Sequence, residues 1–311
     1  AEASASIFAQ SEVITYTDRA LALLAEEPST DETVRRRIDI LMRKERGIVF
    51  TYGETSVARE QLLESAYSLS HEIDDVTYRF RVLKQIRAYY GWRGDRAKIA
   101  EISPEHLALA QASGDAEALS AAYWEMGELY FGQGKFADAL EQLEFALTVG
   151  NSDFAGRHHA LYSYGSLFLS AMLQAHLIWL LGYPDRSRQQ AFEAAHSVDR
   201  EGLILHQLAV SSYFCIYLQY LGDLQALGAA IEKLKEKFRI LAHQDSMFEV
   251  GMMEGWYQVE TESSQAGLEQ ITTSLRGMQA RGSRVYHPYW LCLLAQAQSK
   301  QAQPSEALEA L

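Results

Sequence analysis

The stretch that decides the fold is YWEMGELYFGQGKFADALEQLEFAL, residues 123–147. Two segments with apolar residues at helical spacing flank the turn sequence Gly-Gln-Gly-Lys, so the stretch predicts two short amphipathic helices and a tight turn. The first helix shows the spacing aromatic-x2-apolar-Gly-x2-Tyr, and the second shows Ala-x3-apolar. The residues with these spacings are Tyr123, Met126, Gly127, Tyr130, Ala139 and Leu143.

This spacing has a physical reason. Gly127 and Ala139 are small where the two helices of a hairpin are expected to cross closely, and large residues fill the space around them. The pattern contains most of the tetratricopeptide (TPR) signature. One such hairpin cannot bury its own apolar face, so the stretch implies neighbouring repeats.

Turns equivalent to the one at Gly134 recur along the chain. The separations between them are 41, 40, 48, 40, 40 and 40 residues, which is a repeat period. The predicted turn positions are Gly53, Gly94, Gly134, Gly182, Gly222, Glu262 and Ala302. The residue seven positions before the turn is small in the last five repeats. In the first two it is Arg46 and Arg87, so these repeats are irregular or their register is shifted by one residue to Gly47.

The fold class we expect is all-α: a right-handed α-solenoid of about seven TPR-like helix hairpins with a period of about 40 residues. We expect one domain over residues 1–311, with an irregular N-terminal repeat in 1–50 and regular repeats in 51–311, the last one truncated. No alternating strand pattern of useful length interrupts the helices. The sequence lacks an initial Met and stops inside a helical pattern, so we expect it to be a piece of a longer protein.

The expected helices follow from caps and periodicity. Asp31 is expected to cap the second of them. They cover residues 12–27, 31–50, 56–71, 75–92, 95–111, 115–131, 135–149, a long helix ending at 181, 186–198, 199–221, 223–241, 245–261, 264–280, 283–301 and 304–311.

Composition excludes several function classes. The formal net charge is −13, which argues against a general binder of nucleic acid or of anionic membranes. The most apolar window, residues 167–181, is too short to span a bilayer. The N-terminus has no signal-peptide pattern, and two cysteines do not make a disulfide framework, so we expect a cytoplasmic protein.

Several segments point to a specific relative. They are RAYYGWRGD (87–95), WLLGYPDRSRQQAFEAA (179–195), GDLQAL (222–227) and YHPYWLCLLAQAQSKQAQPSEALEAL (286–311). From about Ser56 to the end, the sequence resembles the C-terminal TPR-like region of large bacterial signalling proteins. In these proteins a class III adenylate/guanylate cyclase domain or a DNA-binding domain precedes a STAND-type AAA ATPase module.

The resemblance implies a sensor or scaffold arm whose partner is a protein or peptide, including the ATPase or cyclase module of the same full-length protein. Because the motifs that carry the resemblance are packing motifs, the resemblance identifies a structural module and predicts no chemical activity. The sequence has no Walker A pattern, and no cyclase metal-binding aspartates can be assigned.

No pattern predicts catalysis, a cofactor or a metal site. The nearest metal-like cluster is Asp153 with His158 and His159, but adjacent helical residues point about 100° apart, so solvated or capping histidines are the better interpretation. Cys215 and Cys292 fall on or near packing positions, where buried inert thiols are expected. We therefore expect no enzymatic activity.

The concave face is the better candidate site. In TPR solenoids the first helix of each hairpin lines this face, and exposed aromatic residues there can bind a peptide or a small ligand. The alternative is that these side chains pack on the next repeat. The candidate partner-binding residues are Arg81, Lys84, Trp124, Glu128, His176, Trp179, Gln219 and Trp256.

Two questions stay open: the role of a group of basic residues and the function of the chain. The basic residues of the helix 31–50, with Arg79, Arg81, Lys84 and Arg87, form either an anion-attracting stripe or ordinary paired surface charge. The leading hypothesis for function is a non-catalytic protein–protein interaction and sensing scaffold. The alternative is a regulatory module that binds a small molecule or peptide in the concave groove.

Overall fold

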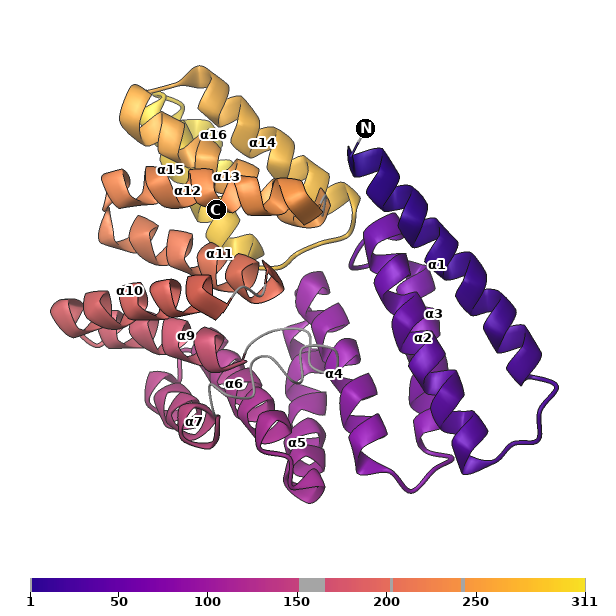
Figure 1. Ribbon diagram of the computed structural model, residues 1–311. Helices are drawn as coiled ribbons and strands as arrows, with labels where there is room; N and C mark the ends of the chain where they lie inside the picture. The colour runs from indigo at the N-terminus through magenta and orange to yellow at the C-terminus, as the bar shows by residue number, and fades with distance from the viewer. Residues whose placement is uncertain (1, 151–165, 202–203, 242–243, 311) are drawn as a thin grey trace. The chain divides into compact units, whose positions relative to one another are not determined.

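The computed structural model of the protein describes residues 2–150, 166–201, 204–241 and 244–310. Over these residues every regular element is a helix, so the predicted all-α class is confirmed. Figure 1 shows the helices packing consecutively in adjacent pairs, as in an α-solenoid. The helices are α1 (Glu2–Leu24), α2 (Asp31–Tyr52), α3 (Val57–Ser70), α4 (Val76–Arg93), α5 (Arg96–Ser113), α6 (Ala116–Gly132), α7 (Phe136–Val149), α9 (Ser166–Leu180), α10 (Pro184–Glu201), α11 (Ile204–Leu221), α12 (Leu224–Leu241), α13 (Gln244–Glu262), α14 (Gln265–Ala280), α15 (His287–Lys300) and α16 (Pro304–Ala310).

The helix starts follow local side-chain chemistry. Asp115 caps α6, because its Oδ1 accepts a hydrogen bond from the backbone N–H of Glu117 at 2.8 Å. The expectation that Asp31 caps α2 is wrong. Thr30 is the capping residue, and it exchanges hydrogen bonds with Thr33 in a capping box.

The predicted turn positions can be compared with the backbone angles. All five predicted glycines have a positive φ, between 67° and 97°. This is the left-handed region, which costs glycine no steric strain. Ala302 also adopts it, with φ 56°. The turn predicted at Glu262 is wrong by one residue: Glu262 still belongs to α13, and Ser263 has the positive φ of 51°.

The small residues before the turns lie where helices approach closely. A Cβ added at Gly127 would lie 2.8 Å from Leu143 Cδ2, which is the contact that the TPR spacing predicts. A Cβ at Gly255 would lie 2.6 Å from the backbone O of Gly267. Gly47 of α2 is also closely packed, but against α1 rather than against its hairpin partner α3: its added Cβ would lie 3.0 Å from Ile14 Cγ1.

The contacts divide the chain into two compact units. Unit 1 comprises Ala1–Ile73, Ala88–Asp95 and Leu221–Leu311, and unit 2 comprises Asp74–Arg87 and Arg96–Tyr220. In unit 2, α6 contacts both α7 and α9, and in unit 1, α13 contacts both α14 and α15. Each of these first helices therefore packs on its own hairpin partner and on the first helix of the next hairpin.

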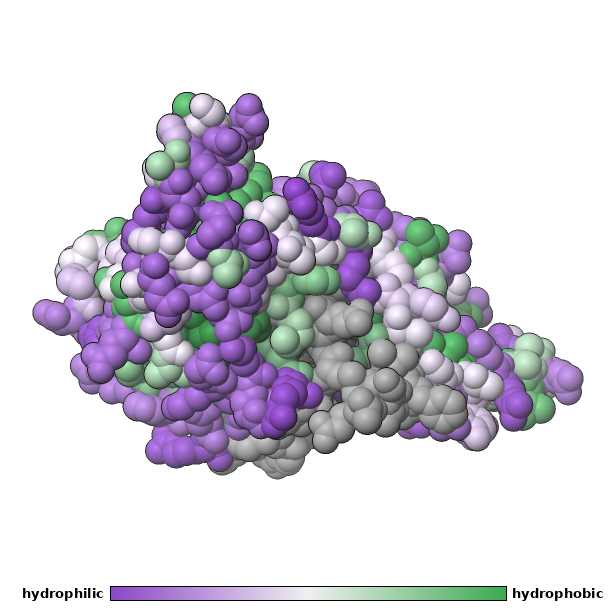
Figure 2. All heavy atoms as spheres, turned by 90° about the horizontal axis from the view of Figure 1, so that it is seen from above, coloured by the Kyte–Doolittle hydropathy of each residue, from purple (hydrophilic) through white to green (hydrophobic). Residues whose placement is uncertain are grey.

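The face of the molecule seen in Figure 2 is mainly polar. Outside the grey region of Figure 2, hydrophilic residues cover most of the visible face, and hydrophobic residues form smaller patches. Among the described helices, none combines the length and apolarity that a bilayer span requires.

Candidate functional site

The predicted site residues fall on the first helices of successive hairpins. Seven of the eight lie in unit 2, and Trp256 lies on α13 in unit 1. Arg81 and Lys84 are on α4, Trp124 and Glu128 on α6, His176 and Trp179 on α9, and Gln219 on α11. In unit 2 the structure groups most of them into two clusters.

The first is a charged cluster formed by Lys84, Arg87, His106, Glu125 and Glu128. Glu125 Oε2 lies 2.7 Å from His106 Nδ1 and 3.5 Å from Arg87 Nε. Arg87 Nη2 donates one hydrogen bond to Glu128 Oε2 at 2.9 Å and another to the backbone O of Glu125 at 2.9 Å. These contacts join α4, α5 and α6.

Burial sets the electrostatics of the charged cluster. Burial alone would raise the pKa of Glu125, but the nearby His106 and Arg87 outweigh it and lower this pKa to about 2. Burial also lowers the pKa of Lys84, against the attraction of Glu125 and Glu117. The charges neutralise one another inside the protein, so the cluster fixes α4 against α6 and offers little to an outside ligand.

The second is an aromatic cluster formed by His176 and Trp179 of α9 with Tyr213, Tyr217 and Tyr220 of α11. The ring of His176 stacks on Tyr217 with centroids 5.4 Å apart, and Trp179 stacks on Tyr220 with centroids 5.7 Å apart. His176 Nε2 lies 3.1 Å from the backbone O of Tyr213. Burial lowers the pKa of His176 to about 4, so the imidazole is neutral at pH 7.

The aromatic cluster reaches the surface at one end. Trp179 and Tyr220 are half-buried. Next to Trp179 in the chain, Leu180, Leu181 and Tyr183 expose 41%, 44% and 62% of their surface. This apolar turn between α9 and α10 is an unusual concentration of exposed hydrophobic side chains, which is typical of a contact surface.

The remaining predicted residues do not join a common surface. Arg81 is half-buried, and its guanidinium lies 5.1 Å from the centre of the Tyr78 ring. Trp124 packs against the hydrophobic core around Leu173 and Leu177. Gln219 is half-buried on α11.

Three of the candidate residues, Lys84, His176 and Trp256, are buried. For these three the structure therefore shows packing on a neighbouring helix, which was the alternative to exposure on the concave face. The physical reason is that each contacts a neighbouring helix: Lys84 belongs to the charged cluster, His176 stacks on α11, and Trp256 Nε1 donates to Gln296 Oε1 at 3.0 Å.

The sequence alone did not predict that His106 and Arg87 bind the buried carboxylate of Glu125. One signal could have found them, because Arg87 occupies a position that is small in five other repeats. A large cation at a helix crossing needs buried carboxylates around it.

The basic residues of α2 are largely paired. Arg36 pairs with Glu32, Arg35 lies 3.9 Å from Asp31, and Lys44 Nζ lies 2.5 Å from Asp18 Oδ1. These contacts favour ordinary surface charge over an anion-attracting stripe, because exposed pairs of this kind neutralise one another locally.

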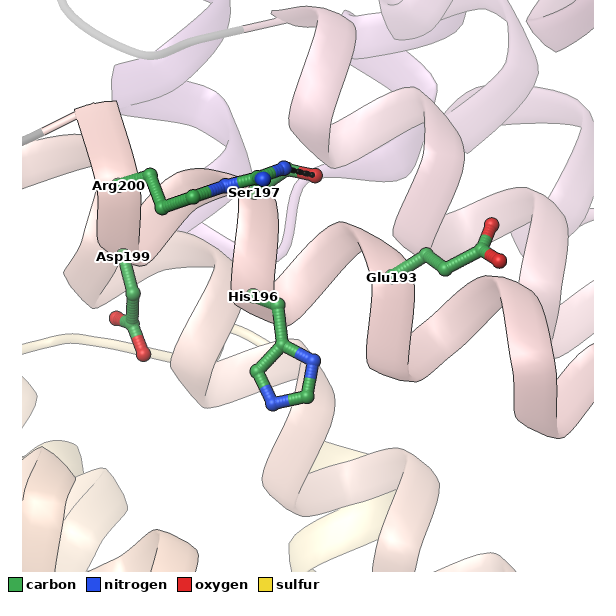
Figure 3. A pocket seen from close by; sticks show the side chains of 5 residues that line it. All are labelled: Glu193, His196, Ser197, Asp199 and Arg200. Carbon is green, nitrogen blue, oxygen red and sulfur yellow. Dashed lines mark hydrogen bonds between the residues drawn. The ribbon is translucent and has the colours of Figure 1, made fainter.

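An open depression of about 510 Å³ lies along the C-terminal half of α10. Figure 3 shows its five lining side chains, all from this one helix, pointing in different directions, with only Arg200 and Ser197 joined by a hydrogen bond. The depression therefore has no convergent polar groups. The lining residues are Glu193, His196, Ser197, Asp199 and Arg200.

Within the described part of the chain, no three His, Cys, Asp or Glu side chains lie close enough together to hold a metal ion. The segment with Asp153, His158 and His159 lies outside the described residues. No protein-family model matches the chain. A search of curated proteins likewise finds no significant similarity.

Proposed function

We propose that the chain is a non-catalytic scaffold for protein–protein interaction and sensing, in which the exposed end of the aromatic cluster holds a peptide segment of the partner. The scaffold is a right-handed superhelix of about seven TPR-like hairpins. By the resemblance of its packing motifs, it is the regulatory arm of a larger bacterial signalling protein in the cytoplasm. The partner includes the ATPase or cyclase module of that protein.

The observation that carries the proposal is the Trp179–Tyr220 stack with the exposed side chains beside it. Trp179 and Tyr220 are half-buried and stack on each other, and Tyr220 also packs edge-on against the buried His176, so the two rings lose little entropy when a partner covers them. Rigid aromatic anchors next to exposed Leu180, Leu181 and Tyr183 supply apolar area for an extended or helical peptide.

The proposal is tested by selecting peptides from a random phage-displayed library on the immobilised chain. We expect a consensus with apolar anchors, and we expect its affinity to fall about tenfold or more in Trp179→Ala, since aromatic anchors contribute more than 1 kcal/mol. The matched control is Phe145→Ala, which removes a 45% exposed aromatic residue from α7. Selection of no consensus, or equal binding by Trp179→Ala and wild type, would count against the proposal.

A second candidate function is a regulatory module that binds a small molecule. One observation favours it: the indole Nε1 of Trp124 is buried and has no hydrogen-bond partner among the described residues. A ligand with an acceptor group would satisfy this donor. A thermal-shift screen of metabolites separates the two functions, because a small molecule that binds the folded chain raises the melting temperature by an amount that grows with the logarithm of its concentration above Kd. The Trp124→Phe variant should abolish that rise.

A further inference from the structure

The connection between α14 and α15 is longer than a hairpin turn. The sequence predicts a helix from residue 283, but α15 begins at His287, and Tyr286 before it has a left-handed φ of 51°. Hydrogen bonds to the preceding helix α14 and the following helix α15 fix the conformation of the connection. Ser283 N–H donates to Met278 O at 2.9 Å, and the buried Trp290 donates through Nε1 to Val285 O at 3.0 Å. Figure 1 shows it as the long loop that leaves α14.

The loop also contacts the α2–α3 turn and the α4–α5 turn, and all of the residues involved belong to unit 1. The hydroxyl of Thr55, in the α2–α3 turn, donates to the backbone O of Arg281. The backbone N–H of Arg284 donates to the backbone O of Trp92, at the end of α4, at 2.8 Å. Segments about 200 residues apart in sequence are therefore joined by hydrogen bonds to the backbone.

Two glycines make this approach possible. A Cβ added at Gly94 would lie 2.8 Å from Arg284 O, and one added at Gly282 would lie 3.0 Å from Thr55 Oγ1. Both glycines have a positive φ, of 68° and 75°. At the equivalent turns of other repeats, Gly134 and Gly222 also have a positive φ, but an added Cβ there would meet nothing within 4 Å. Gly94 is thus required for the contact as well as for its turn.

The contact differs in kind from the rest of the fold. In a solenoid each repeat contacts its neighbours, and burial of apolar side chains holds these interfaces together. The two hydrogen bonds named above join distant repeats of unit 1, and the net contribution of each to stability is modest. A contact of this kind can open while the hairpins on both sides stay folded.

We propose that the α14–α15 loop, residues 281–286, is a clasp that reversibly fastens the C-terminal repeats of unit 1 to its α2–α3 and α4–α5 turns. Thr55, Trp92 and Gly94 form the receiving side of the clasp. Opening it releases the C-terminal hairpins from the N-terminal turns without unfolding either of them. The clasp is a conformational control point built into the repeat array, and it does not depend on the identity of any partner.

Amide hydrogen exchange on the full chain tests the clasp directly. Gly94→Ala places a methyl group against Arg284 O, so the Arg284 amide should exchange about tenfold faster or more, because it loses its acceptor on Trp92. Gly222→Ala is the matched control: it imposes the same strain on a positive-φ turn of unit 1 but meets no neighbour. Equal exchange at Arg284 in the two variants would overturn the proposal.

A distance measurement keeps the proposal testable if Gly94→Ala alters the turn itself. Spin labels at the exposed Cys292 and at Val57→Cys, in a chain whose buried Cys215 is replaced by Ala, report on the two sides of the clasp. Thr55→Val removes the hydroxyl that binds Arg281 and keeps the side-chain shape. We expect it to broaden the distance distribution toward longer values. An unchanged narrow distribution in both Thr55→Val and Gly94→Ala would show that the loop does not hold the two sides together.

Discussion

Trp256 Nε1 donates a hydrogen bond to Gln296 Oε1 at 3.0 Å, and the two residues are 40 positions apart in the chain. Glu260 and Lys300, also 40 positions apart, form an ion pair at 2.7 Å between the same two helices. In unit 2, Trp179 stacks on Tyr220 and Arg87 binds Glu128, each pair 41 positions apart. The period of the sequence is therefore also the spacing of side-chain contacts between successive first helices.

The first prediction concerns Trp256. Because it is buried between α13 and α15, Trp256→Ala should lower the free energy of unfolding by about 3–5 kcal/mol. Gln296→Ala should cost about 1 kcal/mol or less, because Gln296 is exposed and water can replace it. Urea denaturation of both variants measures the difference. A Trp256→Ala variant as stable as wild type would contradict the packing role.

The second prediction concerns helix crossings. Gly255→Ala should be destabilising by about 2 kcal/mol or more, because its Cβ would lie 2.6 Å from the backbone O of Gly267, which cannot move aside. Gly91→Ala is the control, since this α4 glycine has nothing within 4 Å of an added Cβ. It should gain about 1 kcal/mol from helix propensity. Thermal unfolding of the two variants should shift in opposite directions.

The third prediction concerns the two turns without glycine. Ser263 and Ala302 have positive φ values of 51° and 56°. A left-handed conformation costs a non-glycine residue about 1–2 kcal/mol, which exceeds the entropy cost of glycine. Ala302→Gly and Ser263→Gly should therefore each stabilise the chain by about 0.5–1 kcal/mol. The same change at the exposed helical Ala108 should destabilise it by about 1 kcal/mol, and gains or losses of the same sign at all three sites would refute the backbone account.

The fourth prediction concerns pH. The pKa of His176 is about 4 in the folded protein and near its ordinary value of about 6.5 in the unfolded chain. The unfolded state therefore binds a proton first, and stability that is fully present above pH 6.5 is lost as the pH falls toward 4. The loss should approach about 3 kcal/mol.

The His176→Phe variant should remove this pH dependence while keeping the ring on Tyr217, and His196→Gln, an exposed change on α10, should retain it. Protonation of Glu125 does not interfere with this measurement. Its pKa of about 2 is below its ordinary value of 4.5, so its contribution is lost only between pH 4.5 and 2. Denaturation midpoints measured from pH 7 to pH 4 distinguish the variants.

The fifth prediction concerns the charged cluster. Arg87→Met leaves Glu125 and Glu128 without their shared buried cation, which should cost about 3–5 kcal/mol. The matched change Arg81→Met, on the half-buried side of the same helix, should cost about 1 kcal/mol or less. Similar costs for the two variants would contradict the assignment of Arg87 as the centre of the cluster.

The sequence predicted the helical class and the turns well because both depend on local properties. Positive-φ glycines and small residues at helix crossings leave a periodic pattern, and Gly127 and Gly255 lie where that pattern places them. The exposure of the site residues could not be predicted in the same way. A residue on the first helix of a hairpin faces either the concave side or the next first helix, and the rotation between hairpins decides which. In this chain His176 and Trp256 are buried and Trp179 is half-buried.

The most direct test of the proposed scaffold uses the indole N–H signals of the five tryptophans in an NMR titration with a selected peptide. Trp179 lies at the exposed end of the aromatic cluster, whereas Trp256 and Trp290 are buried in unit 1. We predict that the Trp179 signal shifts in proportion to bound peptide while the Trp256 and Trp290 signals stay in place. A peptide that binds and leaves the Trp179 signal unmoved would contradict the account.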